Sequence, residues 1–429
     1  MDDPVDFFRA VAAEHPRCFW LDGGGAREWS GRRSLVGWLE EDDVSLSYDA
    51  ATRTVTRHVG GRCEVVGDDV FEALAAELAA GSPDDQWFGY LGYACRPDLP
   101  AAVGADVPDA VWMRSRNVRL FDHPPVVEEG ALAPVSRPPQ RTGTGGFETV
   151  AAQPPQPPEY AHAFDRVQEH LHAGNSYEVN LTYRLEEASE QDPVTTYLRL
   201  RELNPAPYAG FLQHDLDGAR GWLLSSSPER YALVTADRTL ETKPIKGTTP
   251  RGATAAEDDA AREQLRSDPR FRAENLMIVD LLRNDLSMVC DPGTVEVPVL
   301  MEVESYETVH QLVSTVRGRL REDVTTIETL RALFPAGSMT GAPKLRTMQV
   351  IEEVEASPRG AYAGAFGWIS ADGRADLGVV IRSLTTSGDG TYRLGTGGGI
   401  TVHSDAASEW AESGWKAERL RAALGRMAP

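Results

Sequence analysis

The residue whose setting is most suggestive of chemistry is Lys246, in the run Pro244-Ile245-Lys246-Gly247-Thr248. An amine among apolar residues and glycine is poorly placed for a solvated surface charge. Burial lowers the pKa of a lysine amine, and a neutral amine is a nucleophile. A lysine between a proline and a glycine is also typical of an ordinary loop, so this run alone leaves both interpretations open.

A second group of residues could hold a hard cation. Glu274 falls in one predicted helix. Glu409, Glu412 and Lys416 fall in the last predicted helix, where spacings of three and seven residues place them on one face. If the two helices meet, Glu274 and Glu412 could bind Mg²⁺, which one or two carboxylates commonly hold together with waters and an anionic substrate. A solvated helix face with a Glu412–Lys416 ion pair explains the same spacing.

Other side chains could contact a substrate or move a proton. Arg382 follows an apolar stretch and needs a carboxylate partner, which a substrate or a structural acid could supply. Glu229 follows Ser227-Pro228 and could be a general acid or an exposed turn carboxylate. His310 could be an acid–base group or a hydrogen-bonded strand histidine. The Gly397–Gly399 run indicates either close backbone approach to a bound carboxylate or a crowded strand crossing.

The elements predicted around these residues are interspersed helices and strands without the regular spacing of βαβ units. This pattern favours the α+β class, with large sheets covered by helices. Apolar spacing predicts helices over 159–173, 268–289 and 404–426, the last with Ser404 or Asp405 as N-cap. Alternation and glycine content predict strands over 87–93, 177–185 and 395–399, and residues 222–224 and 231–234 as two arms of a turn.

Composition excludes several classes of function. The 429-residue chain has a net charge of −22, which argues against electrostatic binding to nucleic acid or membrane surfaces. It contains no run of about 18 apolar residues, so no membrane span is expected. The N-terminus has no secretory pattern, and the four cysteines are scattered, so a cytoplasmic location is expected.

Three regions are expected along the chain. Residues 1–122 form an N-terminal region. Residues 123–158 are rich in proline, glycine, threonine and glutamine, and are expected to be a linker or surface excursion. Residues 159–425 carry the candidate chemistry and are expected to form the catalytic domain.

Taken together and in this order, six segments resemble the chorismate-utilising enzymes. They are Ser227–Arg230, Pro244–Thr248, Arg272–Asp285, Gly341–Lys344, Val380–Arg382 and Gly397–Gly399. The resemblance extends over about 160–420, with a further likeness at 80–95. It implies an anthranilate synthase-like fold, in which large antiparallel sheets pack as a sandwich with helices outside.

Within that family, Lys246 makes the sequence similar to the synthase subunits that form 4-amino-4-deoxychorismate, the precursor of p-aminobenzoate. Anthranilate-forming members resemble it throughout but carry a small residue at that position. Isochorismate- and salicylate-forming members carry a water-activating lysine where this chain has Glu178. An anthranilate synthase component I and a non-catalytic subunit that binds chorismate or tryptophan are the alternatives.

The resemblance implies roles for individual residues. Lys246 would attack C2 of chorismate, Glu229 would protonate the leaving 4-hydroxyl group, and ammonia would then add at C4. This chemistry leads us to expect that burial or nearby Lys243 lowers the pKa of Lys246. Glu274 and Glu412, supported by Glu409, match the family's Mg²⁺ ligands. Residues matching substrate contacts are Tyr362, Arg382, Gly397, Gly399 and Lys416, with Ser338 and Thr340 in the neighbouring loop.

The resemblance also raises a question of register and predicts a partner. The family's active-site histidine corresponds to Gln311, whereas this chain has His310 one place earlier. One residue reverses the facing of a strand side chain, so either residue is a candidate. No glutamine amidotransferase segment is recognisable, so ammonia is expected from solution or from a separate amidotransferase subunit.

Overall fold

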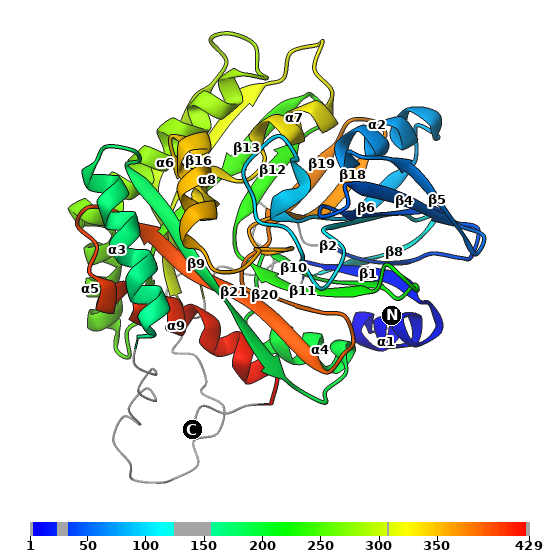
Figure 1. Cartoon of the computed structure of the whole chain (residues 1–429), viewed down its shortest axis with the longest axis horizontal. Helices are drawn as coiled ribbons and strands as arrows, with labels where there is room; N and C mark the ends of the chain where they lie inside the picture. The colour runs from blue at the N-terminus through cyan, green and yellow to red at the C-terminus, as the bar shows by residue number, and fades with distance from the viewer. Residues whose placement is uncertain (1–2, 24–32, 124–155, 307–308, 426–429) are drawn as a thin grey trace.

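The computed structural model describes residues 3–23, 33–123, 156–306 and 309–425. Most of the predicted linker, residues 124–155, lies outside the described residues. Two large antiparallel sheets dominate the described chain, and helices lie around them (Figure 1).

The first sheet combines strands from both ends of the chain. All of its neighbouring strands pair in antiparallel fashion. In order across the sheet, its described strands are β17 (Gly341–Ala342), β9 (Glu178–Ala188), β21 (Thr391–Ile400), β20 (Ser383–Thr386), β11 (Gly221–Ser227), β10 (Tyr208–His214), β1 (Arg17–Asp22), β2 (Arg33–Trp38) and β8 (Asn117–Asp122).

The second sheet is also built from both parts of the sequence. Its described strands, in order, are β14 (Ile245–Pro250), β16 (Val309–Arg319), β13 (Thr239–Lys243), β12 (Arg230–Val234), β19 (Ala375–Val379), β18 (Ala365–Ser370), β6 (Gln86–Leu91), β7 (Ala110–Arg114), β3 (Ser45–Asp49), β4 (Thr54–Val59) and β5 (Arg62–Gly67). An additional strand, β15 (Glu296–Ser305), pairs with β16. Strands of the N-terminal region therefore continue both sheets rather than forming a sheet of their own.

The two sheets pack face to face. Phe19 on β1 of the first sheet stacks on Phe88 on β6 of the second, with ring centroids 4.0 Å apart. Both rings are fully buried, in a cluster with Leu212 and Leu223 from the first sheet and Phe366 from the second. Removing this much apolar surface from water holds the sheets together. The α+β sandwich with helices outside is confirmed.

The helices cover the outer faces of the sheets (Figure 1). They are α1 (Pro4–Glu14), α2 (Val70–Ala80), α3 (Pro158–His172), α4 (Pro193–Leu203), α5 (Ala255–Ser267), α6 (Pro269–Ser287), α7 (Thr326–Leu333), α8 (Lys344–Val354) and α9 (Ala406–Ala423), with short 3₁₀ turns η3 (Tyr93–Cys95) and η4 (Gly337–Met339). The predicted helices correspond to α3, α6 and α9, and Asp405 caps α9 by accepting a hydrogen bond from the Ser408 N–H. Helix α5 was not predicted, because its sequence buries a single residue, Leu265, and so has no apolar stripe. No helix in the described part of the chain is long and apolar enough to cross a membrane.

The predicted turn between residues 222–224 and 231–234 is wrong. Strand β11 belongs to the first sheet and β12 to the second, so the chain crosses between sheets at Pro228-Glu229 instead of forming a hairpin. Both strands are buried on both faces for most of their length, so neither shows the alternation that would have revealed its sheet. The crossing has a consequence for function, because it places Glu229 between the sheets.

Candidate active site

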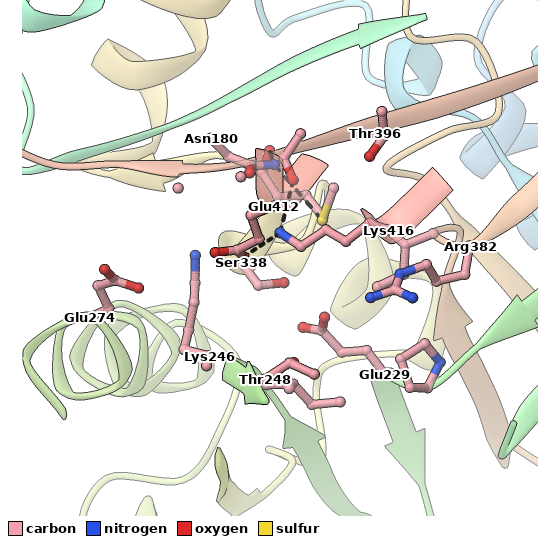
Figure 2. Close-up of a pocket in the computed structure, with 18 of the residues that line it drawn as sticks. Asn180, Glu229, Lys246, Thr248, Glu274, Ser338, Arg382, Thr396, Glu412 and Lys416 are labelled. Atoms are coloured by element: carbon pink, nitrogen blue, oxygen red, sulfur yellow. Dashed lines mark hydrogen bonds and ion pairs between the residues drawn. The ribbon is translucent and has the colours of Figure 1, made fainter. Parts of the chain in front are cut away.

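A cavity lies where the two sheets meet α6 and α9, and most of the candidate residues line it. Figure 2 shows side chains pointing into a common space, among them Glu229, Lys246, Glu274, Arg382, Glu412 and Lys416. The lining residues predicted from the sequence are Glu229, Lys246, Glu274, Ser338, Tyr362, Arg382, Gly397, Gly399, Glu409, Glu412 and Lys416. Sequence positions almost 190 residues apart therefore share one site.

An irregularity in β14 directs Lys246 into this cavity. The pairing of β14 with β16 shifts register between Ile245 and Thr248, and Gly247 in between has φ +94°. A Cβ at residue 247 would lie 2.9 Å from Leu265 Cδ1 and 3.0 Å from Phe271 Cγ, so glycine is required by both conformation and space. Strand irregularities of this kind re-aim side chains beside active sites.

The Lys246 ammonium is held by carboxylates. It is 9% exposed, and its Nζ donates a hydrogen bond to Oε1 of Glu178 on β9. Burial opposes the charge, but Glu178, Glu274 and Glu229 outweigh it, and the pKa of Lys246 is raised above its ordinary value. The expectation of a lowered pKa is therefore wrong for this structure. Lys243 does not supply the expected repulsion, because it forms an ion pair with Glu304 at 2.7 Å.

Glu229 is a buried acid rather than an exposed turn carboxylate. It is 5% exposed, and the nearby Ser338 hydroxyl and Ile245 backbone N–H favour the charged form of its carboxyl group. Burial raises the pKa of Glu229 to about 7, against the lowering effect of Ser338 and Lys246. A carboxyl group with this pKa is protonated in a large fraction of molecules at neutral pH and can donate a proton.

Cationic side chains provide a site for an anionic ligand. Arg382 lies over the Trp415 ring, and no carboxylate within the described ranges pairs with its guanidinium. Burial lowers the pKa of Arg382 to about 10, so it remains charged at neutral pH. Lys416 donates to the Gly397 carbonyl at 2.9 Å and pairs with Glu412 at 2.8 Å. A guanidinium that pairs with no carboxylate of the described chain is suited to bidentate binding of a ligand carboxylate.

Three acidic side chains come together from α6 and α9. Burial raises the pKa of Glu274 to about 7 and also raises the pKa of Glu409, whereas Lys416 lowers the pKa of Glu412. Two carboxyl groups that resist ionisation in one cavity favour a cation between them. No three His, Cys, Asp or Glu side chains within the described ranges lie close enough to hold a metal ion by themselves. These residues suit a metal that keeps water and substrate ligands, as Mg²⁺ does.

Two candidate residues lie outside the cavity. His310 is buried between Ser305 Oγ, 2.8 Å from its Nδ1, and Asp258 Oδ1, 3.0 Å from its Nε2. Its neighbour Gln311 lines the cavity instead, because successive strand side chains face opposite ways. The structure therefore corrects the assignment of a catalytic role to His310. Thr340 is also buried, and its hydroxyl donates to the backbone carbonyls of Ala336 and Gly337.

Some lining residues were not predicted. Arg270 lies in the first turn of α6, four residues before Glu274, a spacing that places both on one helix face. Asn180 lies two residues after Glu178 on β9, a spacing that places both side chains on one face of the strand. These signals were present. No pattern in the sequence linked Phe271 to the cavity.

The chain is similar to known proteins over most of its length. The chain matches the chorismate binding enzyme family over residues 16–422. Aminodeoxychorismate synthase from Streptomyces pristinaespiralis is 40% identical over 462 residues, covering 97% of this chain and 63% of that protein. Anthranilate synthase component 1 from Streptomyces coelicolor is 35% identical over 436 residues, covering 91% of this chain and 84% of that protein.

A solved structure has the same fold. The crystal structure of anthranilate synthase component I from Streptococcus pneumoniae superposes with a TM-score of 0.71 at 26% identity, covering 91% of this chain and 92% of that one. The family match includes every candidate residue of the cavity described above. The chain therefore belongs to the chorismate binding enzyme family.

Proposed function

We propose that this chain converts chorismate and ammonia into 4-amino-4-deoxychorismate, a precursor of p-aminobenzoate. The observation that carries the proposal is a lysine amine, Lys246, in the same cavity as the buried acid Glu229. Further support comes from the 40% identity to a protein named aminodeoxychorismate synthase. The chain spans 63% of that protein's length.

Chorismate is a dicarboxylate, and the cavity offers groups for both ends. Arg382 and Lys416 would bind carboxylate oxygens, and Tyr362 and the open backbone of Gly397 and Gly399 would complete that surface. Glu274 and Glu412, with Glu409 beside them, would hold Mg²⁺. When bound, that ion would neutralise the charge of the ring carboxylate.

The proposed reaction consists of two allylic displacements. The neutral amine of Lys246 forms a bond to C2, the ring double bonds shift, and the C4–O bond breaks as Glu229 supplies a proton to release water. Ammonia then forms a bond to C4, the double bonds shift back, and the C2–N bond electrons return to Lys246. The product ammonium gives a proton to the Glu229 carboxylate, so the sum is chorismate plus ammonia giving aminodeoxychorismate plus water. Covalent catalysis divides one difficult substitution at a single carbon into two easier steps.

The ammonia would come from a separate glutamine amidotransferase subunit. The related anthranilate synthases of known sequence or structure carry the names component 1 and component I. Those names support a partner subunit for this chain as well.

A second candidate is anthranilate synthesis. The anthranilate synthase component 1 from Streptomyces coelicolor matches over 84% of its own length, a larger share than the aminodeoxychorismate synthase. In that reaction ammonia adds at C2 and pyruvate is lost. The Lys246 amine in the cavity favours the first candidate, because it would compete with ammonia for C2.

Product identification tests the proposal. The purified chain is incubated with chorismate, Mg²⁺ and an ammonium salt, and the products are separated and assayed for pyruvate. Aminodeoxychorismate without pyruvate is expected, with Glu274→Ala abolishing turnover. Anthranilate and stoichiometric pyruvate would instead support the second candidate and contradict the first.

A further inference from the structure

Lys246 cannot attack chorismate in the state that its surroundings favour. Its ammonium nitrogen has no free electron pair, and the carboxylates of the cavity stabilise that charged form. Some group must therefore remove a proton before the C2–N bond forms. The requirement for such a group rests on the function proposed above.

Four carboxylates face the Lys246 amine. They are Glu178 on β9, Glu229 at the crossing between sheets, Glu274 on α6 and Glu412 on α9. Glu178 is the one in hydrogen-bond contact with Nζ within the described chain. Glu229 is the proposed proton donor to the leaving group, and Glu412 pairs with Lys416 at 2.8 Å, so each of these already has another role.

The surroundings of Glu178 suit a proton acceptor. Its side chain is fully buried, and its Oε2 has no hydrogen-bond partner in the described chain. Lys246 is the one cation that forms an ion pair with it there. A buried polar atom without a partner is rare and is retained where function requires it. In the described chain, the Glu178 carboxylate therefore accepts no hydrogen bond that would compete with the one from Lys246.

The backbone of β21 encloses the pair. A Cβ at Gly399 would lie 2.1 Å from Glu178 Oε1 and 3.1 Å from Lys246 Nζ, so the strand passes directly over the contact. A ligand in the cavity would cover the remaining side. In such low-dielectric surroundings a neutral amine and a neutral acid cost less than two separate charges. Substrate binding would therefore promote proton transfer within the pair.

We propose that Glu178 is the general base that takes a proton from Lys246 Nζ. The N–H bond breaks, its electron pair stays on nitrogen, and the proton forms an O–H bond on the Glu178 carboxylate. Lys246 is then a neutral amine and attacks C2. When ammonia displaces Lys246 from the ring, the released amine takes the proton back from Glu178, and the ion pair is restored for the next cycle.

The test compares the pH dependence of Glu178→Gln with that of the wild type. Glutamine keeps the shape but accepts no proton, so Lys246 must lose its proton to water before substrate closes the cavity. We expect kcat/KM at pH 7 to fall by about 10². The ratio of wild-type to variant kcat/KM should shrink by tenfold per pH unit above that, because the loss of the Glu229 proton lowers the rate of both enzymes equally. Chorismate affinity should change by less than about threefold.

The rate of Glu178→Gln at pH 7 distinguishes a general base from a residue that only stabilises the Lys246 ammonium. If Glu178 only stabilised the ammonium, its removal would leave Lys246 more easily deprotonated, and Glu178→Gln would equal or exceed the wild type at pH 7. That result would overturn the inference. Should the glutamine variant not fold, judged by circular dichroism, Glu178→Asp serves instead. It withdraws the carboxylate by one methylene and should lower kcat by about tenfold, and full activity would overturn the inference.

Product formation by the wild-type enzyme distinguishes a failure of the Glu178 assignment from a failure of the proposed function. If the wild type forms no aminodeoxychorismate, the proposed function fails whatever Glu178 does. If the wild type forms it and Glu178→Gln shows an unchanged rate and pH profile, the function stands and Glu178 is not the base.

Discussion

Lys246 and Glu178 form a hydrogen bond that joins the two sheets of the molecule. Lys246 lies on β14 of the second sheet and Glu178 on β9 of the first, and both side chains are buried at the contact. Breaking a buried ion pair by removing one partner leaves an uncompensated charge. The same contact therefore contributes to the packing of the sheets and to the state of the amine on which the proposed chemistry depends.

The acid role of Glu229 predicts a pH dependence. Burial raises the pKa of Glu229 to about 7, so the protonated form is present below that pH and is lost as pH rises through it. The rate should therefore be constant at low pH and should fall up to tenfold per pH unit above about 7. Glu229→Gln should lower kcat by about 10² to 10³ and remove this limb. A limb that persists near pH 7 in the glutamine variant would assign it to another group, such as Glu274.

The carboxylates of α6 and α9 predict a requirement for Mg²⁺. Removing divalent cations with a chelator should abolish activity, and added Mg²⁺ should restore it. Glu274→Gln removes one proposed ligand and should raise the Mg²⁺ concentration needed for half-maximal activity by at least about tenfold. Asp280→Asn on the same helix is the control, because Asp280 is 79% exposed and lies outside the cavity. If both variants needed the same Mg²⁺ concentration for half-maximal activity, Glu274 would not be a metal ligand.

The close approach of β21 predicts that Gly399 tolerates no side chain. Gly399→Ala would place its Cβ 2.1 Å from Glu178 Oε1 and push that carboxylate away from Lys246. We expect kcat to fall by at least about 10² while the fold is retained. Gly67→Ala on β5 is a matched control, since no atom lies within 4 Å of the added carbon. Normal kinetics in Gly399→Ala would show that the enclosure has no role in catalysis.

The position of His310 predicts a structural role. Its ring joins Ser305 on β15 to Asp258 on α5, and its removal leaves both partners without that bond. His310→Ala should lower the free energy of unfolding by about 1 to 3 kcal/mol, measured by urea denaturation, and change kcat by less than about twofold. Gln311→Ala, which alters the cavity wall, should affect kinetics more than stability. A large loss of activity in His310→Ala at unchanged stability would contradict this assignment.

Local patterns in the sequence predicted the elements with strong periodicity. Helices α3, α6 and α9 and strand β9 correspond closely to the ranges that apolar spacing and alternation indicated. Which sheet a strand joins was not predictable in the same way. Strands β11 and β12 are both buried on two faces, so neither carries an alternation that assigns it to one sheet.

The candidate site was predictable as a set of residues but not as an arrangement. Resemblance to a family grouped Lys246, Glu229 and Glu274, whereas spacing alone related only residues within one helix or strand. The charge state of Lys246 depends on Glu178, which lies 68 positions earlier in the other sheet. No local pattern reports such a contact, and for that reason the expected direction of the Lys246 pKa was wrong.

Mass spectrometry of the enzyme, quenched during turnover with limiting ammonia, shows whether Lys246 bonds to C2 of chorismate. We expect a peptide containing Lys246 that is heavier by the mass of chorismate less one water. The Lys246→Ala variant should lack this adduct, keep chorismate and Mg²⁺ binding, and lose at least about 10³ in kcat. An unmodified Lys246 peptide together with full activity in Lys246→Ala would show that the reaction does not pass through a covalent adduct at Lys246.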